Sequence, residues 1–455
     1  MSFYRSSLVQ IIILGFLCFC CPGMFNALNG MGGGGKINDS TASIANTALY
    51  ACFAIFGLMS GAVHNILGPR LSLLFGGLCY TIYVGSFLAY NHTETPAFNI
   101  AAGALLGIGA ALLWTAQGAI MMAYPTERQK GRFIAIFWII FNLGGVMGGF
   151  IPFALNFHTG IGEGAPATSG VSDATYIAFM TVMTFGALLS LLLLPPQLVS
   201  REDGSPVIIK QAPAWQHEAH RVLALFRDPT MLLLLPIFLS SNWFYSYQFN
   251  GVNGFVFNLR TRGLNNVIYW GAQMVGATIL GRFLDTPNLR RAVRATYSLI
   301  AIALLFTAVW AGGLVFQLRY SRHDQPFNWD FTQSSRVSGP IILYSLYGLL
   351  DAALQTWCYW VMGASTNDTG RLALYAGFYK GIQSAGGALS WGIDWVGVDY
   401  PIQLIISWAL FTLALPSAYL VAKRLTDTNI TEGESNQATT TSTLSTSEKS
   451  KDFYT

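Results

Sequence analysis

Twelve apolar runs, each close to the length of a membrane-crossing helix, dominate this sequence of 455 residues. A helix of about 20 apolar residues crosses the hydrocarbon core of a bilayer, where every backbone polar group must be satisfied within the segment. Only 10% of the residues are charged, against about 25% in an average soluble protein, so too few charges remain to cover a water-facing surface. The chain is therefore predicted to be an all-α polytopic membrane protein in contact with the lipid bilayer. The runs lie near 7–28, 41–63, 71–90, 98–123, 132–156, 174–194, 230–258, 266–284, 293–318, 338–363, 372–393 and 400–422.

The Lys and Arg residues between the runs predict the orientation. An even number of spans places both termini on one side, and the connections on that side carry most of the basic residues, among them Arg128, Lys130 and Arg132. Cytoplasmic loops are enriched in Lys and Arg, so both termini are predicted to be cytoplasmic. Asn38 and Asn91 head glycosylation sequons in loops on the other side, which makes the chain a candidate glycoprotein. This pattern fits the plasma membrane and an internal membrane equally.

The distribution of apolar and polar residues divides the chain into four segments. Residues 1–194 and 230–424 each hold six of the runs and are predicted to form two six-helix halves. Residues 195–229 contain five prolines and mixed charges, which is typical of a cytoplasmic linker. Residues 425–455 are rich in Thr, Ser, Glu and Lys with little to bury, and are predicted to form a disordered cytoplasmic tail.

The two halves share short sequence patterns in the same order. Phe25–Gly30 reads Phe-Asn-Ala-Leu-Asn-Gly, and Phe249–Gly254 repeats its Phe, both Asn and the Gly at an offset of 224 (249 − 25). The fifth and eleventh runs both begin with Gly-Arg and carry glycine-rich faces, at 144–149 and 377–387. Duplicated halves around a substrate path are typical of alternating-access transporters, although glycine faces also allow close helix packing for its own sake.

A turn that contains glycine and arginine joins the second run to the third. Its Gly61, Gly68 and Arg70 resemble the major-facilitator signature loop, which has an acid between the two glycines. Here that position is Asn65, so the charge relay that the resemblance implies is weakened in the first half. The second half keeps the acid in the residues that match at an offset of 220 (281 − 61), which are Gly281 and Asp285.

Longer stretches resemble the Unc-ninety-three-like branch of the major facilitator superfamily, and its fungal members in particular. These stretches are Leu67–Ser72, Leu113–Gly118, Tyr124–Thr126 and Tyr379–Ser384, and the resemblance extends over about residues 8–424. It implies a major-facilitator fold of twelve transmembrane helices in two pseudo-symmetric halves. It also implies a choice between transport and regulation, because animal relatives regulate potassium channels or escort other membrane proteins.

Two charged residues fall deep inside predicted spans, where a charge is costly and by default functional. Asp351 lies about 18 Å along its helix from the cytoplasmic end, and Lys380 about 14 Å along the next helix, at about 1.5 Å per residue. Opposite charges at similar depth on consecutive helices predict either a buried ion pair that fixes helix packing or a coupling site. In the second case the pair breaks when a cation or a proton binds Asp351.

The seventh run is too polar and aromatic for a lipid-facing helix over residues 242–250, and Gly251 and Gly254 follow. A break in that helix is therefore predicted, and unwound backbone at this depth is tolerated only where it lines a cavity. Amide and aromatic side chains of other spans are expected to join it, although hydrogen bonds between helices also explain single amides. Beside Asp351 and Lys380, the candidate cavity residues are Asn26, Asn29, Trp114, Gln117, Asn142, Asn242, Tyr245, Gln248, Asn250, Gln355, Trp357 and Gln383.

No catalytic or nucleotide-binding pattern accompanies these features. The six cysteines lie inside apolar runs without the spacing of a zinc site, and no basic cluster indicates nucleic acid. The sequence therefore favours a protein that is not an enzyme and needs no cofactor or metal: a secondary active transporter of a small polar or cationic solute, working by alternating access. The alternative is a transporter-fold protein that does not transport but regulates or traffics a membrane-protein partner, for example an ion channel. The altered loop at Asn65 and Ile66 favours this alternative.

Overall fold

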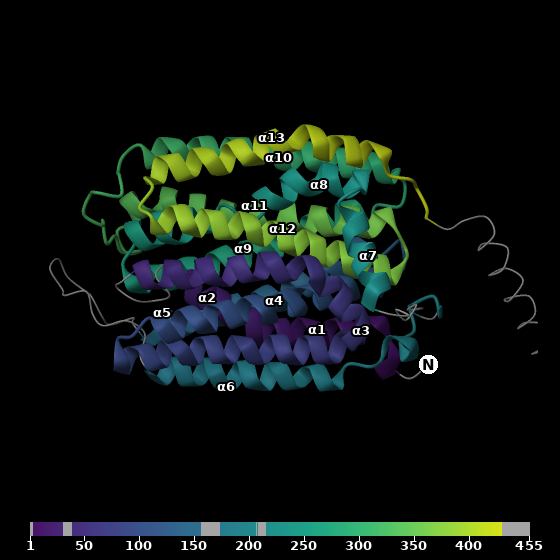
Figure 1. Ribbon diagram of the computed structural model, residues 1–455. Helices are drawn as coiled ribbons and strands as arrows, with labels where there is room; N and C mark the ends of the chain where they lie inside the picture. The colour runs from purple at the N-terminus through teal and green to yellow at the C-terminus, as the bar shows by residue number, and fades with distance from the viewer. Residues whose placement is uncertain (1–2, 31–38, 156–172, 206, 208–214, 430–455) are drawn as a thin grey trace, which may run out of the picture.

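The computed structural model describes residues 3–30, 39–155, 173–205, 207 and 215–429. Long helices form one elongated bundle, and the start of α1 and the end of α13 lie at the same end of it, which we call the terminal end (Figure 1). The helices of the first half are α1 (Ser7–Cys18), α2 (Met24–Gly30), α3 (Asp39–Thr93), α4 (Ala97–Ala123), α5 (Lys130–Leu155) and α6 (Asp173–Leu189). Helix α7 (Trp215–Leu225) precedes the second half, which consists of α8 (Pro229–Ser240), α9 (Leu259–Leu284), α10 (Arg291–Gln317), α11 (Ser334–Ser365), α12 (Thr369–Trp395) and α13 (Tyr400–Arg424).

Eight helices in the described part of the chain are long and apolar enough to cross a membrane. Helix α3 crosses twice, because it bends at Gly68, whose φ of 77° favours glycine, and Pro69 follows. Tyr83 donates to Asn46 Oδ1 at 3.3 Å, which ties the two arms of α3 side by side. The remaining spans, α8 with the segment after it, α9 and α12, bury more polar side chains and are less apolar. The chain is therefore an integral membrane protein, and its described residues form twelve spans, as predicted.

Several spans differ in detail from the predicted runs. The predicted run 230–258 is two pieces, because α8 ends at Ser240 and the chain turns before it continues as a π-helical segment, Tyr247–Gly254. This is the break that the polar composition predicted. The predicted runs 41–63 and 71–90 extend until they meet at the bend of α3. The first span also contains an unpredicted π-helical turn, Phe19–Gly23, around Pro22, which cannot donate a backbone hydrogen bond.

The halves pack closely where glycines face each other. A Cβ atom on Gly57 of α3 would lie 2.7 Å from the Cα atom of Gly381 in α12, and one on Gly61 would lie equally close to the α12 backbone. A Cβ atom on Gly281 of α9 would lie 2.6 Å from the carbonyl oxygen of Gly131 in α5. Larger side chains at these positions would push the helices apart, so these glycines serve packing between the two halves.

Candidate functional site

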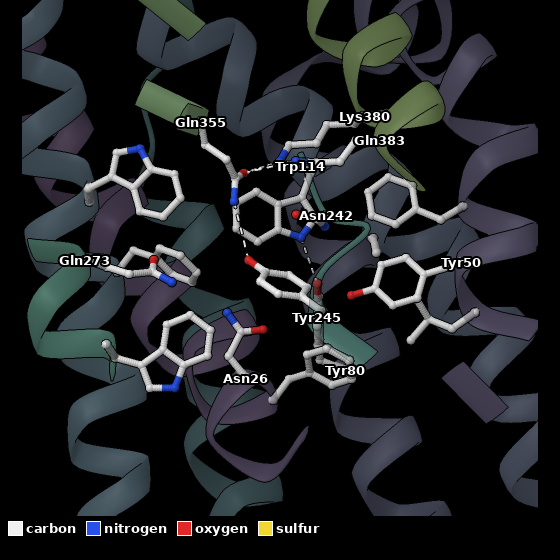
Figure 2. Close-up of a pocket in the computed structure, with 17 residues that line it drawn as sticks. Asn26, Tyr50, Tyr80, Trp114, Asn242, Tyr245, Gln273, Gln355, Lys380 and Gln383 are labelled. Carbon is white, nitrogen blue, oxygen red and sulfur yellow. Dashed lines mark hydrogen bonds between the residues drawn. The ribbon is translucent and has the colours of Figure 1, made fainter. Parts of the chain in front are cut away.

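A cavity of about 50 Å³ lies between the two halves (Figure 2). Helices α2 to α5 line it from the first half, and the broken seventh span, α9, α11 and α12 line it from the second. Nine of the lining residues are aromatic, and Lys380 is the one charged residue among the described residues that line it. The lining consists of Phe25, Asn26, Leu49, Tyr50, Phe53, Tyr80, Ala110, Trp114, Trp138, Phe141, Asn242, Tyr245, Trp270, Gln273, Gln355, Lys380 and Gln383.

Gln355 connects the two buried charges. Lys380 Nζ donates to Gln383 Oε1 at 2.7 Å and to Gln355 Oε1 at 3.3 Å, as Figure 2 shows from the cavity side. Gln355 Nε2 in turn donates to Asp351 Oδ1 at 2.7 Å. The direct ion pair predicted between Asp351 and Lys380 is therefore replaced by an amide bridge. The sequence placed both charges at a similar depth, but it does not reveal which side chain stands between them.

Asp351 lies behind the lining and is 1% exposed. Its Oδ2 atom accepts hydrogen bonds from Tyr245 at 2.8 Å, from Gln273 at 2.7 Å and from Tyr269 at 3.3 Å. A buried carboxylate is very costly unless donors or an opposite charge satisfy it. Here four neutral donors, of which Gln355 is one, satisfy the oxygen atoms of Asp351.

Three aromatic rings surround the ammonium group of Lys380. Its Nζ atom lies 4.7 Å from the ring centre of Trp114, 5.0 Å from that of Tyr379 and 5.3 Å from that of Tyr359. Aromatic faces stabilise a cation that has lost its water. Tyr359 also donates to Gln117 Oε1 at 3.0 Å, so Gln117 supports the ring from outside the lining.

The structure brings most of the predicted cavity residues together. Asp351 lies one hydrogen bond behind the lining, and Gln117 holds Tyr359, whose ring contacts Lys380 of the lining. Gln248 lies further back, because it accepts a hydrogen bond at 2.9 Å from Tyr269, which in turn donates to Asp351. The predicted residues on the lining itself are Asn26, Trp114, Asn242, Tyr245, Gln355, Lys380 and Gln383.

Four predicted residues are placed elsewhere. Asn29 donates at 3.4 Å to an amide of α3 inside the first half, and Trp357 donates at 2.9 Å to a backbone carbonyl of α10. Asn250 donates to Asp394 at 2.8 Å, near the end of the bundle opposite the termini. Asn142 is buried, and its amide has no hydrogen-bond partner among the described residues. Sequence position gives the depth of such a residue but not the direction in which it faces, so these four residues are not part of the lining.

Sequence reasoning missed several polar lining residues. Gln273 matters most among them, because it both lines the cavity and holds Asp351. Its helix, α9, is unusually polar for a span, and this signal was available in the sequence. The other missed lining residues with a polar group are aromatic: Tyr50, Tyr80, Trp138 and Trp270. The sequence contains no comparable signal for them, because aromatic side chains also face lipid.

Residues 33–369 match the protein family described as "Ion channel regulatory protein UNC-93". The chain belongs to the UNC-93 family. UNC93-like protein 1 of Arabidopsis thaliana is 49% identical over 420 residues, which cover 92% of this chain and 90% of that protein. An UNC93-like protein of Schizosaccharomyces pombe is 42% identical over 412 residues, which cover 90% of this chain and 80% of that protein.

Solved structures of major-facilitator transporters share the fold of this UNC-93 family member. A bacterial homologue of the iron transporter ferroportin, in its outward-facing state, has a TM-score of 0.63 at 10% identity and covers 92% of this chain and 100% of its own. FucP in the outward conformation has a TM-score of 0.60 at 12% identity, with 92% and 99% covered. At such low identity the likeness shows the fold alone, which is the major-facilitator fold predicted.

Asp285 joins the halves of this UNC-93 protein at the terminal end. Its carboxylate accepts hydrogen bonds from the backbone N–H groups of Gly131 at 2.8 Å and Arg132 at 2.6 Å. It thus caps the first turn of α5 from across the interface, where a negative charge also suits the helix dipole. Burial raises the pKa of Asp285 to about 6, although both backbone donors favour the charged form.

In the first half, the position that matches Asp285 holds an amide, Asn65. Asn65 donates to Glu218 Oε2 of α7 at 2.8 Å and to a backbone carbonyl at the start of α12 at 3.4 Å. Glu218 is fully buried and accepts from Arg221 at 2.8 Å, and Arg221 lies 3.6 Å from Asp368, which caps α12. The acid that Asp285 supplies in the second half therefore comes from the linker helix in the first.

Further contacts hold the terminal end together. Arg70 donates to a backbone carbonyl between α6 and α7, inside the first half. Glu127, between α4 and α5, pairs with Arg291 at 2.9 Å and accepts from Asn367 at 2.6 Å and from the N–H of Asn429 at 3.1 Å. Burial alone would raise the pKa of Glu127, but the Asn367 amide and the Arg291 guanidinium hold it below its ordinary value.

Hydrogen bonds also join the halves at the opposite end. Asn253 and Asn266 donate to backbone carbonyls of α2 at 2.8 and 2.9 Å. Asp394 of α12 accepts from Ser43 of α3 at 3.3 Å and pairs with Arg322. The cavity thus lies between two sets of contacts that each bridge the halves.

Proposed function

We propose that this protein is a secondary active transporter of a small polar solute that works by alternating access between its two halves. The observation that carries the proposal is the cavity, which both halves line and which lies between bridging contacts at each end. Transporters built from repeats hold their substrate at the interface of the repeats, near the middle of the bilayer. An aromatic lining with a few convergent polar groups suits a small solute of defined orientation.

We propose the chain Asp351–Gln355–Lys380 as the coupling element. Gln355 contacts both charges, so a proton or ion that changes the charge of Asp351 also changes the partners left for Lys380. The same change reaches Tyr245 and Gln273, which hold Asp351 and line the cavity. Coupling and solute binding then act through the same side chains.

We further propose that the terminal end faces the cytoplasm, as the basic residues predict. Asn91 is exposed at the opposite end, where a glycosylation site on the outside would lie, whereas Asn38 falls outside the described residues. Glycosylation of Asn91 tests this orientation. We expect the wild-type protein to lose mass on endoglycosidase treatment and the Asn91→Gln variant to lose none. Asn429 also heads a sequon, Asn-Ile-Thr, but lies at the terminal end, so sugar on Asn429 would contradict the proposed orientation. We also propose the division of the chain into two six-helix halves, residues 1–194 and 230–424, a cytoplasmic linker, 195–229, and a cytoplasmic tail, 425–455.

Thermal unfolding followed by uptake tests the transport proposal. The purified full chain is heated with a panel of ions and small metabolites, and each solute that raises the melting temperature is then offered to proteoliposomes. A solute bound only by the folded state adds about 2.7 kcal/mol of stability at a hundredfold excess over its Kd. We expect at least one such solute to be taken up, and Asp351→Asn to abolish its uptake while Glu94→Gln, an exposed residue, leaves it unchanged. If solutes bind to the protein but none of them is taken up, the transport proposal is contradicted.

A second candidate function is regulation or trafficking of another membrane protein. The description of the family as ion channel regulatory proteins favours it. The altered loop at Asn65 no longer supports it, because Glu218 supplies the acid there. It predicts a stable membrane-protein partner that co-purifies in mild detergent from the native membrane. Recovery of the chain alone, together with solute uptake, would contradict this function.

A further inference from the structure

We infer that the solute of the central cavity is a small carboxylate, an inference that rests on the transport function proposed above. The charge of the lining is the first reason. Lys380 supplies its positive charge, and the buried acid Asp351 lies behind the lining with its oxygens occupied by four neutral donors. A cation that entered would meet the ammonium group of Lys380, whereas a carboxylate would meet an opposite charge.

Unpaired donors on both sides of the cavity are the second reason. Trp138 of α5 is 2% exposed and Trp270 of α9 is 1% exposed, and both line the cavity. Their indole N–H groups have no hydrogen-bond partner among the described residues. Lys380 adds a third donor, because an ammonium group has three N–H bonds and the two glutamine oxygens take two of them. A carboxylate that binds Lys380 has lone pairs left for the two indole N–H groups, whose nitrogen atoms are covered in this structure and reach the solute once the indole side chains turn toward it.

Two free acceptors on the second half indicate what else the solute carries. Asn242 Oδ1 and Gln273 Oε1 are buried without a partner among the described residues, and both side chains line the cavity. Both oxygen atoms are covered in this structure, and once their side chains turn toward the cavity they suit a hydroxyl group on the same solute, while the aromatic walls suit its short carbon chain. The cavity of about 50 Å³ restricts the solute to a few heavy atoms. Lactate combines these features, so it is the probe of choice.

The test compares lactate with two molecules of nearly the same shape. Lactamide keeps the hydroxyl but has no charge, and 1-amino-2-propanol keeps it but carries a positive charge. Thermal unfolding of the purified full chain is titrated with each. We expect lactate to raise the melting temperature at a concentration at least tenfold lower than either analogue, as is typical when a charge-assisted hydrogen bond is gained. Equal or stronger binding of either analogue would overturn the inference.

Variants connect the binding to the named groups. Lys380→Met is expected to weaken lactate binding about tenfold or more, while the exposed Lys423→Met leaves it unchanged. Trp270→Phe keeps an aromatic wall but removes one donor, and is expected to weaken lactate binding without a large change in melting temperature. If Lys380→Met does not fold, Trp270→Phe decides. Unchanged lactate binding in Trp270→Phe and in any folded Lys380→Met would overturn the inference.

Uptake separates this inference from the proposed function. Lactate that binds but does not enter proteoliposomes would contradict transport and leave the carboxylate site in place. Uptake of an amine or a neutral solute, with no binding of lactate, would overturn the carboxylate and leave transport in place.

Discussion

Gln355 contacts both buried charges and lies on the cavity lining. Its amide nitrogen serves Asp351, and its amide oxygen serves Lys380 and also accepts from Gln383 at 3.2 Å. An amide can do this because it carries donors and an acceptor on one planar group. A leucine of similar size keeps the volume and loses every one of these contacts.

We therefore expect Gln355→Leu to destabilise the protein by about 2 kcal/mol or more, because buried polar groups left without a partner cost about 1–3 kcal/mol each. Thermal unfolding of the purified chain measures the effect. Gln197→Leu, at an exposed glutamine, is the control and should stay within about 0.5 kcal/mol. Equal melting temperatures for the two variants would contradict the bridging role of Gln355.

The sequence predicted part of this centre. Asp351 and Lys380 stand out because charges inside apolar runs are rare, and Gln355 was among the predicted amides. The contact of Gln273 and Tyr269 with Asp351 depends on how α9 is rotated against α11, and one sequence contains no measure of that rotation. For the same reason Asn29 and Asn250 were expected on the lining and lie elsewhere.

Among the elements, α7 is the one that the sequence described least well. The segment 195–229 was predicted only as a linker, but its helix buries Glu218 against Asn65 and thereby contacts the start of α12. The loss of the acid at position 65 therefore does not leave this end without a carboxylate.

An exchange of the two side chains tests that arrangement. Asn65→Asp alone sets a carboxylate against Glu218 and should destabilise the protein, and Glu218→Gln alone weakens the contact with Arg221. The double variant Asn65→Asp with Glu218→Gln restores one acid and one amide. We expect it to be more stable than the sum of the single effects predicts, by about 0.5–3 kcal/mol. Additive changes in unfolding free energy would show that the two residues do not interact.

Asp285 predicts a pH dependence at the same end. Its pKa is raised by burial from its ordinary value of 3.8 to about 6, so the folded protein binds a proton there more tightly than the unfolded chain does. The stability that this gives is present below pH 3.8 and is lost as pH rises through about 6. Melting temperatures of the wild type and Asp285→Asn across this window test it. We expect the wild type to lose stability relative to the variant between these two values, and a constant difference would contradict the account.

At the scale of the whole molecule, the twelve spans and the duplicated halves followed from the apolar runs and the repeated patterns. These properties are predictable because the bilayer imposes length and composition on every span. The direct meeting of the two arms of α3 at Gly68 and the π-helical turn in the first span are local backbone choices that hydropathy does not record. The contacts that bridge the halves at the two ends are also known only from the structure, because the residues that meet there are hundreds of positions apart in the sequence.

The central claim is that the two ends of the bundle open in turn. Spin labels on introduced cysteines measure this as distances across the halves, between Thr95 and Val396 at the opposite end and between Arg128 and Asn288 at the terminal end. All four positions are exposed, whereas the native cysteines are buried or half-buried. Alternating access predicts that each pair samples a short and a long distance as solute or pH changes. It also predicts that a long distance at one end occurs together with a short distance at the other end. A single short distance at both ends under every condition would contradict the claim.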